Sequence, residues 1–449
     1  MRKMRDSGVE RIGEVPEGWE VKPLKSIVSC NDSVLSEETP DGYEFDYVDI
    51  GSVKYGVGIV EKERMRFSEA PSRARRVVEK GDVIVSTVRT YLKSIASIPD
   101  FKTPLITSTG FAVLRARDIY PSFLNFALLS QLFVDEVEAR SVGISYPAIN
   151  ATELIAIKVV VPPLPEQRRI ADYLDEKCGA IDVAIAEAKK GIEEYKAWKK
   201  SLIFETVTGK RRVGVFNAET QRRREAEKMK PSGIPWIGTI PEGWAMVKAS
   251  KIFSVITDFV ASGSFADLRE NVKYLDYPDY AQLIRTADVS GKSHELKPVY
   301  ISKESYDFLS GSNLYGGELL LPNIGASVGD VYIVPRLYER MSLAPNAIMV
   351  KNSSCDKFYF YFFSCDSGRL ALEDIAESTA QPKFNKTDFR NLRLPAPATE
   401  EQQAIANYLD EKCAAIDAMV AEKEALIADL EAYKKSLIFE VVTGKCEVA

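Results

Sequence analysis

The sequence has few of the residues and patterns that common enzyme classes need. It contains a single histidine, His294, and its six cysteines never form a Cys-x-x-Cys pair, so a zinc site of the Cys/His type is excluded. It has no phosphate-binding GxxxxGK(S/T) loop, no nucleophile elbow and no methyltransferase tetrapeptide of the DPPY or NPPY form. We therefore predict a protein without a catalytic site, a metal site or a cofactor of its own.

Long apolar runs are also missing. No stretch of about 18 apolar residues could span a bilayer, and the basic residues 1–5 are followed by polar residues rather than by an apolar signal segment. Unpaired cysteines are typical of proteins in the reducing cytoplasm. We expect a cytoplasmic protein that has no membrane partner.

A net positive charge is the third absence. The chain carries 59 Lys and Arg against 65 Asp and Glu, a formal net charge of −6, which argues mildly against a nucleic-acid partner. Any DNA-binding surface must therefore be a local patch, or a groove that a partner completes. The 449 residues, 45% hydrophobic and 28% charged, suit a folded protein. A chain of this length predicts about three domains.

The sequence contains a long internal repeat. The segments 166–182 (EQRRIADYLDEKCGAID) and 401–417 (EQQAIANYLDEKCAAID) are nearly identical, as are Lys199–Lys210 and Lys434–Lys445, both at an offset of 235. The strings SGVERIGEVPEGW (7–19) and SGIPWIGTIPEGW (232–244) match at an offset of 225. The repeat is far longer than that of a solenoid, so it indicates a duplicated module. Each module has a short start, a variable segment (20–160 or 245–395) and a conserved tail.

Each conserved tail predicts one long helix. The first tail opens with Pro162-Pro163-Leu164-Pro165-Glu166, and proline and glutamate are typical of a helix start. Gly209 and Gly444 suit helix C-terminal caps. About 42 residues at a rise of 1.5 Å make a rod of about 60 Å.

Apolar residues in both tails recur at spacings of three and four, which is typical of a helix packed lengthwise on another helix. Ordinary core helices of two separate domains are the alternative. Two similar modules on a short linker can pack around a pseudo-dyad, which makes the helices antiparallel. Cys178 and Cys413 then act as small hydrophobic residues in the seam. The predicted seam consists of Leu174, Cys178, Ile181, Ile185, Ile192 and Leu202 in the first tail, and Leu409, Cys413, Ile416, Val420, Ile427 and Leu437 in the second.

The variable segments mix short strands and turn residues with one or two helices each. The expected helices are Leu124–Glu138 and Phe358–Ile375, and the expected strands are Val83–Val85, Phe111–Leu114, Ile157–Val161, Leu319–Leu321, Val331–Val334 and Ala347–Val350. The predicted fold class is therefore α+β. Two α+β domains are each followed by a long helix, and the two helices pair as an antiparallel coiled coil with pseudo-twofold symmetry.

Basic residues cluster once in the first variable segment. Such a run is usually a solvated face, but in a DNA-binding protein it can contact phosphates or base edges. The run consists of Lys62, Arg64, Arg66, Arg73, Arg75 and Arg76. A second basic stretch, the linker at 211–231, is interpreted as a solvated connector that is either helical or irregular, with nucleic-acid contact as the alternative.

Two further loops stand at equivalent places, each after a Gly-acid pair and a short apolar strand. They follow Gly81-Asp82 and Gly317-Glu318, and they are either ordinary surface turns or base-reading loops. Asn150 and Asn385 close the two segments and are better interpreted as turn or cap residues than as base readers. The candidate DNA contacts in these regions are Arg89, Tyr91, Lys93, Asn323, Ser327 and Lys383.

One pattern resembles a metal-dependent nuclease. Pro278-Asp279 followed by Glu295-Leu296-Lys297 fits a PD…ExK arrangement, in which two carboxylates and a lysine hold Mg²⁺ and a phosphate. The pattern is short, and the first module has no counterpart. We therefore interpret it as a chance match.

The order of these motifs resembles that of one protein family. The PEGW start, the variable segment, the Pro-Pro-Leu-Pro-Glu-Gln entry and the helix ending in Ser-Leu-Ile-Phe-Glu…Thr-Gly-Lys resemble the specificity (S) subunit of type I restriction–modification systems. The resemblance covers nearly the whole chain, and the order and duplication of the strings make it specific. One departure is that Gln403 and Ala404 stand where the first helix has Arg168 and Arg169.

The resemblance implies a function and partners. Residues 1–164 and 232–399 would be target-recognition domains that each read half of a split site on double-stranded DNA. Residues 165–210 and 400–449 would be the spacer helices, joined by the linker at 211–231. Two modification subunits, which methylate adenine, and the restriction subunits, which translocate and cleave DNA, would dock on the chain. The alternatives are a coiled-coil scaffold that binds no DNA, and a nuclease acting through Asp279, Glu295 and Lys297.

Overall fold

The computed structural model describes residues 2–213, 228–291, 296–351, 354–377 and 380–448. The chain divides into two compact units. Unit 1 comprises Met1–Lys190 and Lys423–Ala449, and unit 2 comprises Gly191–Glu422. Each unit contains one variable segment and a part of each of the two longest helices, α4 (Leu164–Val207) and α13 (Thr399–Val442). None of the helices in the described ranges is long and apolar enough to cross a membrane.

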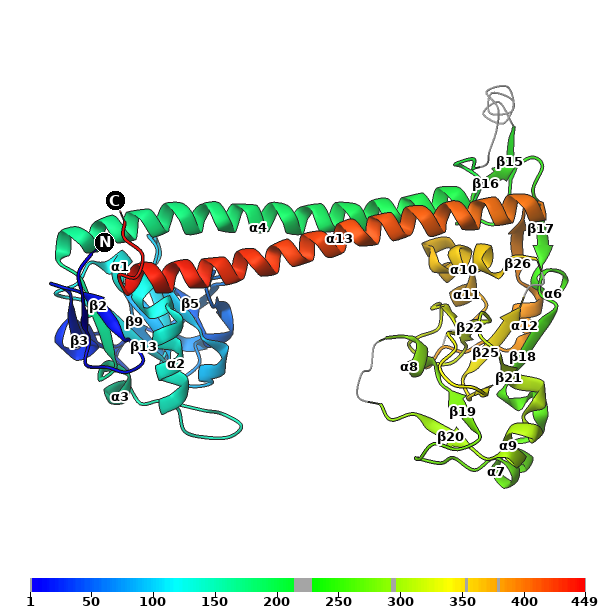
Figure 1. Ribbon diagram of the computed structural model, residues 1–449, viewed down its shortest axis with the longest axis horizontal. Helices are drawn as coiled ribbons and strands as arrows, with labels where there is room; N and C mark the ends of the chain where they lie inside the picture. Colours follow the sequence, from blue (N-terminus) through cyan, green and yellow to red (C-terminus); the bar gives the residue numbers. More distant parts are fainter. Residues whose placement is uncertain (1, 214–227, 292–295, 352–353, 378–379, 449) are drawn as a thin grey trace. The chain divides into compact units, whose positions relative to one another are not determined.

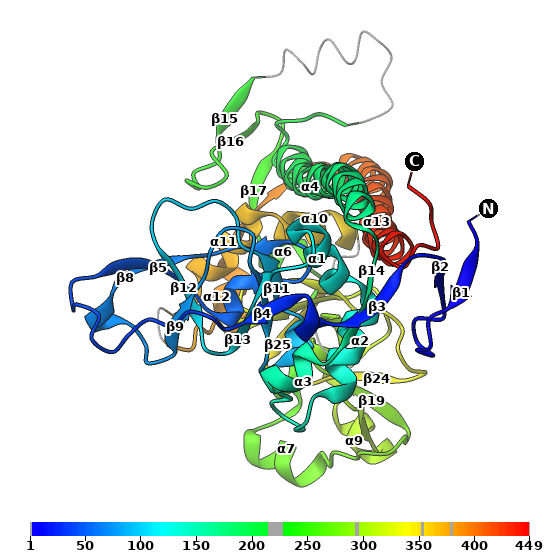
Figure 2. The same cartoon turned by 90° about the vertical axis from the view of Figure 1, so that its left-hand side faces the viewer.

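Unit 1 contains two four-stranded sheets. The first is antiparallel and the second contains one parallel pair, β5 with β12. Across the first sheet the strands are, in order, β11 (Ile95–Ser97), β10 (Val83–Ser86), β13 (Phe111–Ala116) and β4 (Val28–Cys30). Across the second sheet they are β8 (Glu63–Arg66), β5 (Glu44–Val48), β12 (Leu105–Ser108) and β9 (Ala74–Val77) (Figures 1 and 2). Short pairs join β1 (Met4–Asp6) to β2 (Glu14–Pro16), β3 (Glu20–Pro23) to β14 (Lys158–Val161), and β6 (Val53–Lys54) to β7 (Gly58–Ile59).

Unit 2 repeats this topology. Its sheets have the same order and the same single parallel pair, β19 with β24. The strands are β23 (Tyr332–Ile333), β22 (Leu319–Pro322), β25 (Ala347–Lys351) and β18 (Val255–Asp258), then β20 (Val299–Ile301), β19 (Ala281–Ile284), β24 (Met341–Leu343) and β21 (Asn313–Leu314). The short pairs are β15 (Met229–Pro231) with β16 (Thr239–Pro241), and β17 (Ala245–Lys248) with β26 (Arg393–Ala396). The variable segments therefore share one fold, and the predicted α+β class is confirmed.

The central strands explain how each domain is layered. All four residues of β10 are buried, as expected for a strand covered on both faces. Val83 and Val85 pack into the core with the helices, whereas Ile84 packs with residues of the second sheet such as Val48 and Leu105. In unit 2 the residues of β22 alternate in the same way between two cores. The apolar runs at Val83–Val85 and Leu319–Leu321 were correctly predicted as strands.

The helices of the variable segments differ from the prediction. Each predicted single helix is a pair: α1 (Pro121–Leu129) with α2 (Gln131–Arg140), and α10 (Asp356–Ser364) with α11 (Asp366–Asp374). The break falls at Ser130, with φ −64° and ψ 143°, and at Cys365, with φ −89° and ψ 162°. One extended residue turns the chain while the apolar pattern continues, because both helices of a pair pack on the same core. The predictions of one continuous helix at Leu124–Glu138 and of another at Phe358–Ile375 were therefore wrong.

The remaining helices are short and lie beside the sheets. Unit 1 has α3 (Ala151–Ile155), and unit 2 has α6 (Ala249–Ile252), α7 (Phe265–Asn271), α8 (Thr286–Val289), α9 (Lys303–Phe308) and α12 (Lys386–Asn391). Asn150 and Asn385 are the N-caps of α3 and α12: the side chain of Asn150 accepts from the backbone N–H of Glu153, and that of Asn385 from Thr387 and Asp388. Their interpretation as cap residues is confirmed.

The start of each long helix is fixed by a repeated tryptophan–glutamate pair. The indole N–H of Trp19 donates to Glu166 at 3.0 Å, and that of Trp244 donates to Glu401 at 3.1 Å. The next residue, Gln167 or Gln402, donates from Nε2 to the carbonyl of Pro162 or Pro397 at 2.8 or 2.9 Å. These bonds link the PEGW string to the Glu-Gln string. They explain why two motifs so distant in sequence are repeated together.

The ends of the long helices also contact the PEGW strings. Gly209 and Gly444 have φ of 73° and 74°, and a Cβ on either would lie about 2.5 Å from a carbon of Pro241 or Pro16. Within unit 1 this brings the two ends of the chain together, beside β1, β2 and the end of α13 (Figures 1 and 2). Arg2 pairs with Glu166 there, as Arg212 pairs with Glu401 in unit 2.

Most of the predicted linker, residues 214–227, lies outside the described residues. Its last described residues form β15 rather than a helix. Arg212 is not solvated: its side chain is 16% exposed, ion-paired with Glu401 at 3.0 Å and stacked on Trp244. Both described ends of the linker are therefore parts of unit 2.

Candidate nucleic-acid interface

The two Gly-acid pairs position equivalent loops. Buried Asp82 forms two hydrogen bonds of 2.9 Å with Arg115, and buried Glu318 lies 3.9 Å from the equivalent Lys351. Each carboxylate also accepts backbone N–H groups of the preceding turn, from Glu79 in unit 1 and from residues 315 and 316 in unit 2. The acid therefore fixes the turn before the central strand. The loop that leaves the other end of that strand is presented in the same way in both units.

Each loop is tied to the segment that closes its domain. Val88 bridges to Ala148, and Ile324 bridges to Lys383. The carbonyls of Thr87 and Asn323 accept from the N–H groups of Ile149 and Phe384. Ala148 and Ile149 of unit 1 and Lys383 and Phe384 of unit 2 thus occupy equivalent places. In each unit two segments that are far apart in the sequence form one surface.

The candidate residues on these loops differ in what they contact. Arg89 and Tyr91 are exposed, whereas Lys93 forms an ion pair with Glu138 at 3.1 Å. Asn323 donates one N–H of Nδ2 to the carbonyl of Phe384 at 2.9 Å, whereas its buried Oδ1 has no hydrogen-bond partner among the described residues. Ser327 is half-buried, and Lys383 is exposed, 3.9 Å from Glu377.

The basic run of the first segment is divided in space. Lys62, Arg64 and Arg66 lie on or beside β8, whereas Arg73, Arg75 and Arg76 lie on or beside β9, at the opposite edge of the same four-stranded sheet. Strands are about 4.8 Å apart, so about 14 Å separates the two groups. One run in the sequence is therefore two separate groups on the surface.

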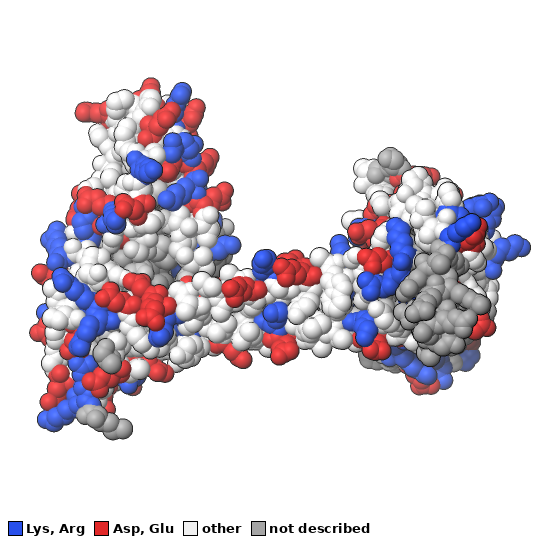
Figure 3. Space-filling model, turned by 90° about the horizontal axis from the view of Figure 1, so that it is seen from above, with Lys and Arg blue, Asp and Glu red and all other residues white. Residues whose placement is uncertain are grey.

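Several members of the run are already engaged. Arg64 and Arg66 form ion pairs with Asp46 and Glu44 of β5, and the guanidinium of Arg75 lies 4.9 Å from the ring centroid of Phe67. Figure 3 shows Lys and Arg interspersed with Asp and Glu over the visible face of each unit rather than gathered in one field. The acidic net charge is thus distributed over both units.

The nuclease-like pattern is not assembled as far as the structure describes it. Glu295 lies outside the described residues. Asp279 accepts the backbone N–H of Tyr280, and its carbonyl accepts the hydroxyl of Tyr338 at 2.8 Å. Among the described side chains, no group of three or more His, Cys, Asp or Glu could hold a metal ion.

The residues of the predicted seam lie mostly in the interior. Ten of them are buried, whereas Val420 and Ile427 are half-buried. In unit 1, Cys178 and Ile181 of α4 share a core with Leu437 of α13, and Lys434 pairs with Asp182 at 2.6 Å. In unit 2, Leu202 of α4 shares a core with Cys413 and Ile416 of α13, and Lys199 pairs with Asp417 at 2.7 Å. Burial raises the pKa of Cys178 to about 11.

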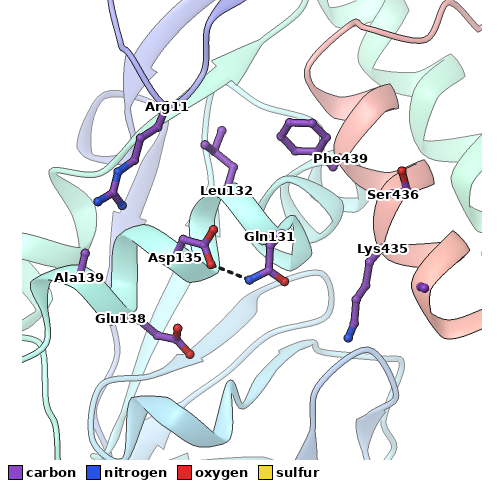
Figure 4. Close-up of a pocket in the computed structure, with 10 residues that line it drawn as sticks. Arg11, Gln131, Leu132, Asp135, Glu138, Ala139, Lys435, Ser436 and Phe439 are labelled. Atoms are coloured by element: carbon purple, nitrogen blue, oxygen red, sulfur yellow. Dashed lines mark hydrogen bonds between the residues drawn. The ribbon is translucent and has the colours of Figure 1, made fainter. Parts of the chain in front are cut away.

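A groove of about 890 Å³ lies in unit 1 between α2, the N-terminal segment and α13. Figure 4 shows Arg11, Asp135 and Lys435 around it, with Phe439 as an apolar wall and Gln131 bonded to Asp135 at 2.6 Å. Its lining comes from α2 of the variable segment, from Arg11 of the start string and from α13, and it includes none of the candidate DNA-contacting residues.

Sequence reasoning selected no residue of the exposed loop at 142–148 as a candidate contact. Val142 and Ala148 exchange two backbone hydrogen bonds that close it, and the exposed side chains of Ile144 and Tyr146 lie at its tip. Tyr146 stacks beside Arg89, with 5.3 Å from Cζ to the ring centroid. The signal available in the sequence was a Gly-Ile-Ser-Tyr-Pro string that ends an otherwise helical segment.

Comparisons with known proteins agree with this architecture. The model of the type I restriction modification DNA specificity domain matches residues 16–190 and again 241–427. The MjaX specificity subunit of Methanocaldococcus jannaschii is 26% identical over 97% of this chain and 96% of its own length. The EcoKI specificity subunit of Escherichia coli K12 is 19% identical over 96% of this chain and 90% of its own.

Two solved structures share the fold. A chain from a type I R-M system, solved to explain complex assembly and conformational transition, matches with a TM-score of 0.73 and 22% identity over 96% of this chain and 99% of its own. The HsdS subunit of Thermoanaerobacter tengcongensis matches with a TM-score of 0.54 and 22% identity over 96% of this chain and 98% of its own.

Proposed function

Because this chain belongs to the type I restriction modification DNA specificity family, we propose that it is the non-catalytic subunit that reads a split DNA site for a type I restriction–modification complex. The observation that carries the proposal is the duplication of one reader. Units 1 and 2 present the same two sheets and equivalent loops after β10 and β22. Each domain, 1–164 and 232–399, reads one half of the site.

The helices within 165–210 and 400–449 form the spacer between the readers, as an antiparallel coiled coil. Two ion pairs support this arrangement: Asp182 with Lys434, and Lys199 with Asp417. Along α4, Asp182 comes before Lys199. Along α13 the order of their partners is reversed, because Asp417 comes before Lys434. The two ion pairs are equally spaced along both helices. In one pair α4 supplies the aspartate and α13 the lysine, and in the other pair α4 supplies the lysine and α13 the aspartate. A pseudo-twofold axis that relates the two helices requires this exchange.

Division of the DNA site between two reading domains raises the sequence specificity of binding. Each correctly read base pair contributes about 1–3 kcal/mol of discrimination, and separate halves add. A rigid spacer avoids the ordering cost that a flexible tether has on binding. Because the net charge is −6, the chain alone binds DNA weakly, and the partner subunits complete the positively charged clamp.

The partners are two modification subunits, which supply adenine methylation, and the restriction subunits, which supply translocation and cleavage. The named specificity subunits among the relatives support this assignment. The groove lined by Arg11, Asp135, Lys435 and Phe439 is a suitable docking surface, because it combines an apolar wall with charges of both signs.

The test is to reconstitute the chain with its modification subunits and to map the methylated adenines in a library of random DNA. We expect methylation confined to one bipartite sequence with a fixed spacer. Assembly without any sequence selection would make the chain a scaffold. Cleavage of DNA by the isolated chain in the presence of Mg²⁺ would make it a nuclease.

A further inference from the structure

The turn after β10 contains two residues in the left-handed backbone conformation. Arg89 has φ of 53° and Lys93 has φ of 51°, and they flank the 3₁₀ turn Thr90–Leu92. The equivalent positions in unit 2 are Gly325 and Gly329, with φ of 87° and 98°. The register of β10 on β13 and of β22 on β25 sets this equivalence, since Val83 pairs with Leu114 as Leu319 pairs with Val350.

Glycine adopts this conformation at no steric cost, whereas an arginine does not. One copy of the fold therefore uses the residue that the backbone favours, and the other carries a strained arginine at the same place. Residues with a strained backbone concentrate at functional sites. At such a site the function of the side chain explains why the residue is present, although the backbone conformation favours glycine. Lys93 has a structural partner in Glu138. Among the described residues, Arg89 has no carboxylate within ion-pair distance.

The surroundings hold Arg89 in one place. The N–H of Thr90 donates to the carbonyl of Pro147, and its hydroxyl donates to Ser141 at 2.8 Å. These bonds tie the strained turn to the loop at 142–148, whose Tyr146 ring lies 5.3 Å from the guanidinium. A cation stacked on an aromatic ring loses conformational freedom while its N–H edge stays available.

The same surface exposes apolar side chains. Val142 is 78% exposed, Ile144 is 103% exposed and Tyr146 is 66% exposed. Apolar side chains exposed together on one loop are typical of a binding surface. A planar, charged fork stacked on an aromatic ring matches the edge of a guanine, which presents two acceptors, N7 and O6, in the major groove.

We propose that Arg89, positioned by Tyr146, donates two hydrogen bonds to N7 and O6 of a guanine in the half-site that unit 1 reads. This rests on the proposed function. Because unit 2 has Gly325 at that place, the two half-sites are read by different chemistry, and a guanine contact of this kind belongs to one half only.

The experiment uses the complete methylating complex and the library described above. Arg89→Gly introduces the residue that unit 2 already uses, so the variant melts at the same or a higher temperature. We expect it to lose its preference for one G·C pair by about 5- to 150-fold, with every position of the other half-site unchanged. Arg89→Lys keeps the charge without the planar fork and retains only a part of the same preference, because an ammonium can still donate to N7 and O6. If Arg89→Gly fails to fold, Arg89→Asn serves, because asparagine also tolerates this backbone conformation.

Lys25→Gln is the matched control, because it removes one exposed charge from unit 1 outside this turn and the loop at 142–148. It leaves the preference intact. Tyr146 acts through Arg89, so Tyr146→Ala weakens the same G·C preference while Tyr146→Phe, which retains the ring face, restores it at unchanged melting temperature.

Three results would overturn the inference while the wild-type complex still methylates a bipartite site. Unchanged base preference in Arg89→Gly means that Arg89 reads no base. A uniform loss on all sequences, with a reduced dependence on salt, means that it contacts a phosphate. Loss of assembly with the modification subunits means that the surface docks protein. If the wild-type complex selects no bipartite site, the proposed function itself fails.

Discussion

Two half-buried carboxylates link distant parts of the chain. Glu166 and Glu401 each accept an indole N–H and pair with an arginine, Arg2 or Arg212. The arginines come from unrelated places in the sequence, one near the start of the chain and one just after α4. In each unit a cation thus lies beside this carboxylate, which fits the cost of removing a carboxylate from water without a partner.

Cys178 gives a prediction on pH at the same scale. Burial raises its pKa from 9.0 to about 11, so the folded state holds the thiol proton more tightly than the unfolded state. The stabilisation is complete below pH 9 and is lost as the pH rises from 9 to 11. We expect the stability advantage of the wild type over Cys178→Ala to fall by on the order of 2 kcal/mol across this window.

Urea unfolding at pH 8.5 and at about pH 11 measures this difference. Ile181→Val is the control, because it removes a methyl group from the same seam and introduces no change in titration. Its cost should be equal at both pH values. A Cys178→Ala cost that is independent of pH would contradict the buried thiol.

At the scale of the element, the ends of the long helices are the most constrained points. Gly209 and Gly444 need a positive φ, and a Cβ would collide with Pro241 or Pro16. We predict that Gly209→Ala and Gly444→Ala each lower the free energy of unfolding by about 1–3 kcal/mol. Gly179→Ala is the matched control: it is exposed within α4 with nothing within 4 Å of its Cβ. It should raise stability by up to about 1 kcal/mol. Thermal melting of the three variants measures these changes in stability. A melting temperature that is unchanged in Gly209→Ala and Gly444→Ala would contradict the prediction.

The seam makes a second prediction for the long helices. Ile181 and Ile416 are buried, and an aspartate at either place has no partner in the apolar interior. Ile181→Asp or Ile416→Asp should cost about 3–5 kcal/mol and prevent assembly with the partner subunits. Val183→Asp, on the exposed side of α4, should cost little. Unchanged melting and assembly in both seam variants would mean that the helices do not pair as proposed.

At the scale of the whole molecule, the duplication predicts that the two readers are interchangeable parts. Replacing residues 20–160 by the equivalent segment of a relative should change one half of the methylated sequence and leave the other half intact. Methylation mapping with the hybrid chain provides the measurement. A hybrid in which both halves change, or neither, would refute the assignment of one domain to one half-site.

The spacer makes the last prediction. Inserting one heptad after Ala188 and another after Lys423 keeps the proposed seam in register and lengthens the spacer by about 10 Å. With a rise of about 3.4 Å per base pair, the two half-sites should move apart by about three base pairs. The longer spacing also rotates one half-site about the DNA axis relative to the other, and the resulting strain on docking lowers activity. The methylation that survives should nevertheless show the longer spacer between the half-sites. An active variant with the original spacer would leave the helices as docking surfaces only.

The sequence by itself determined the duplication, the α+β class, the central strands and the capping roles of Asn150 and Asn385. The strands and caps depend on local chemistry: a short apolar run forms a strand that is buried on both faces, and cap residues bond to their nearest neighbours. Such signals are complete within a short window of residues.

The tertiary structure alone decided which residues share a surface. It separated the basic run onto the two edges of one sheet, placed Tyr146 beside Arg89, and divided each predicted helix at Ser130 or Cys365. Strand order depends on pairings between residues far apart in the chain, and a single extended residue leaves the apolar pattern of two successive helices unbroken. Proximity across a sheet or between loops is therefore a property of the packed fold, and no local pattern encodes it.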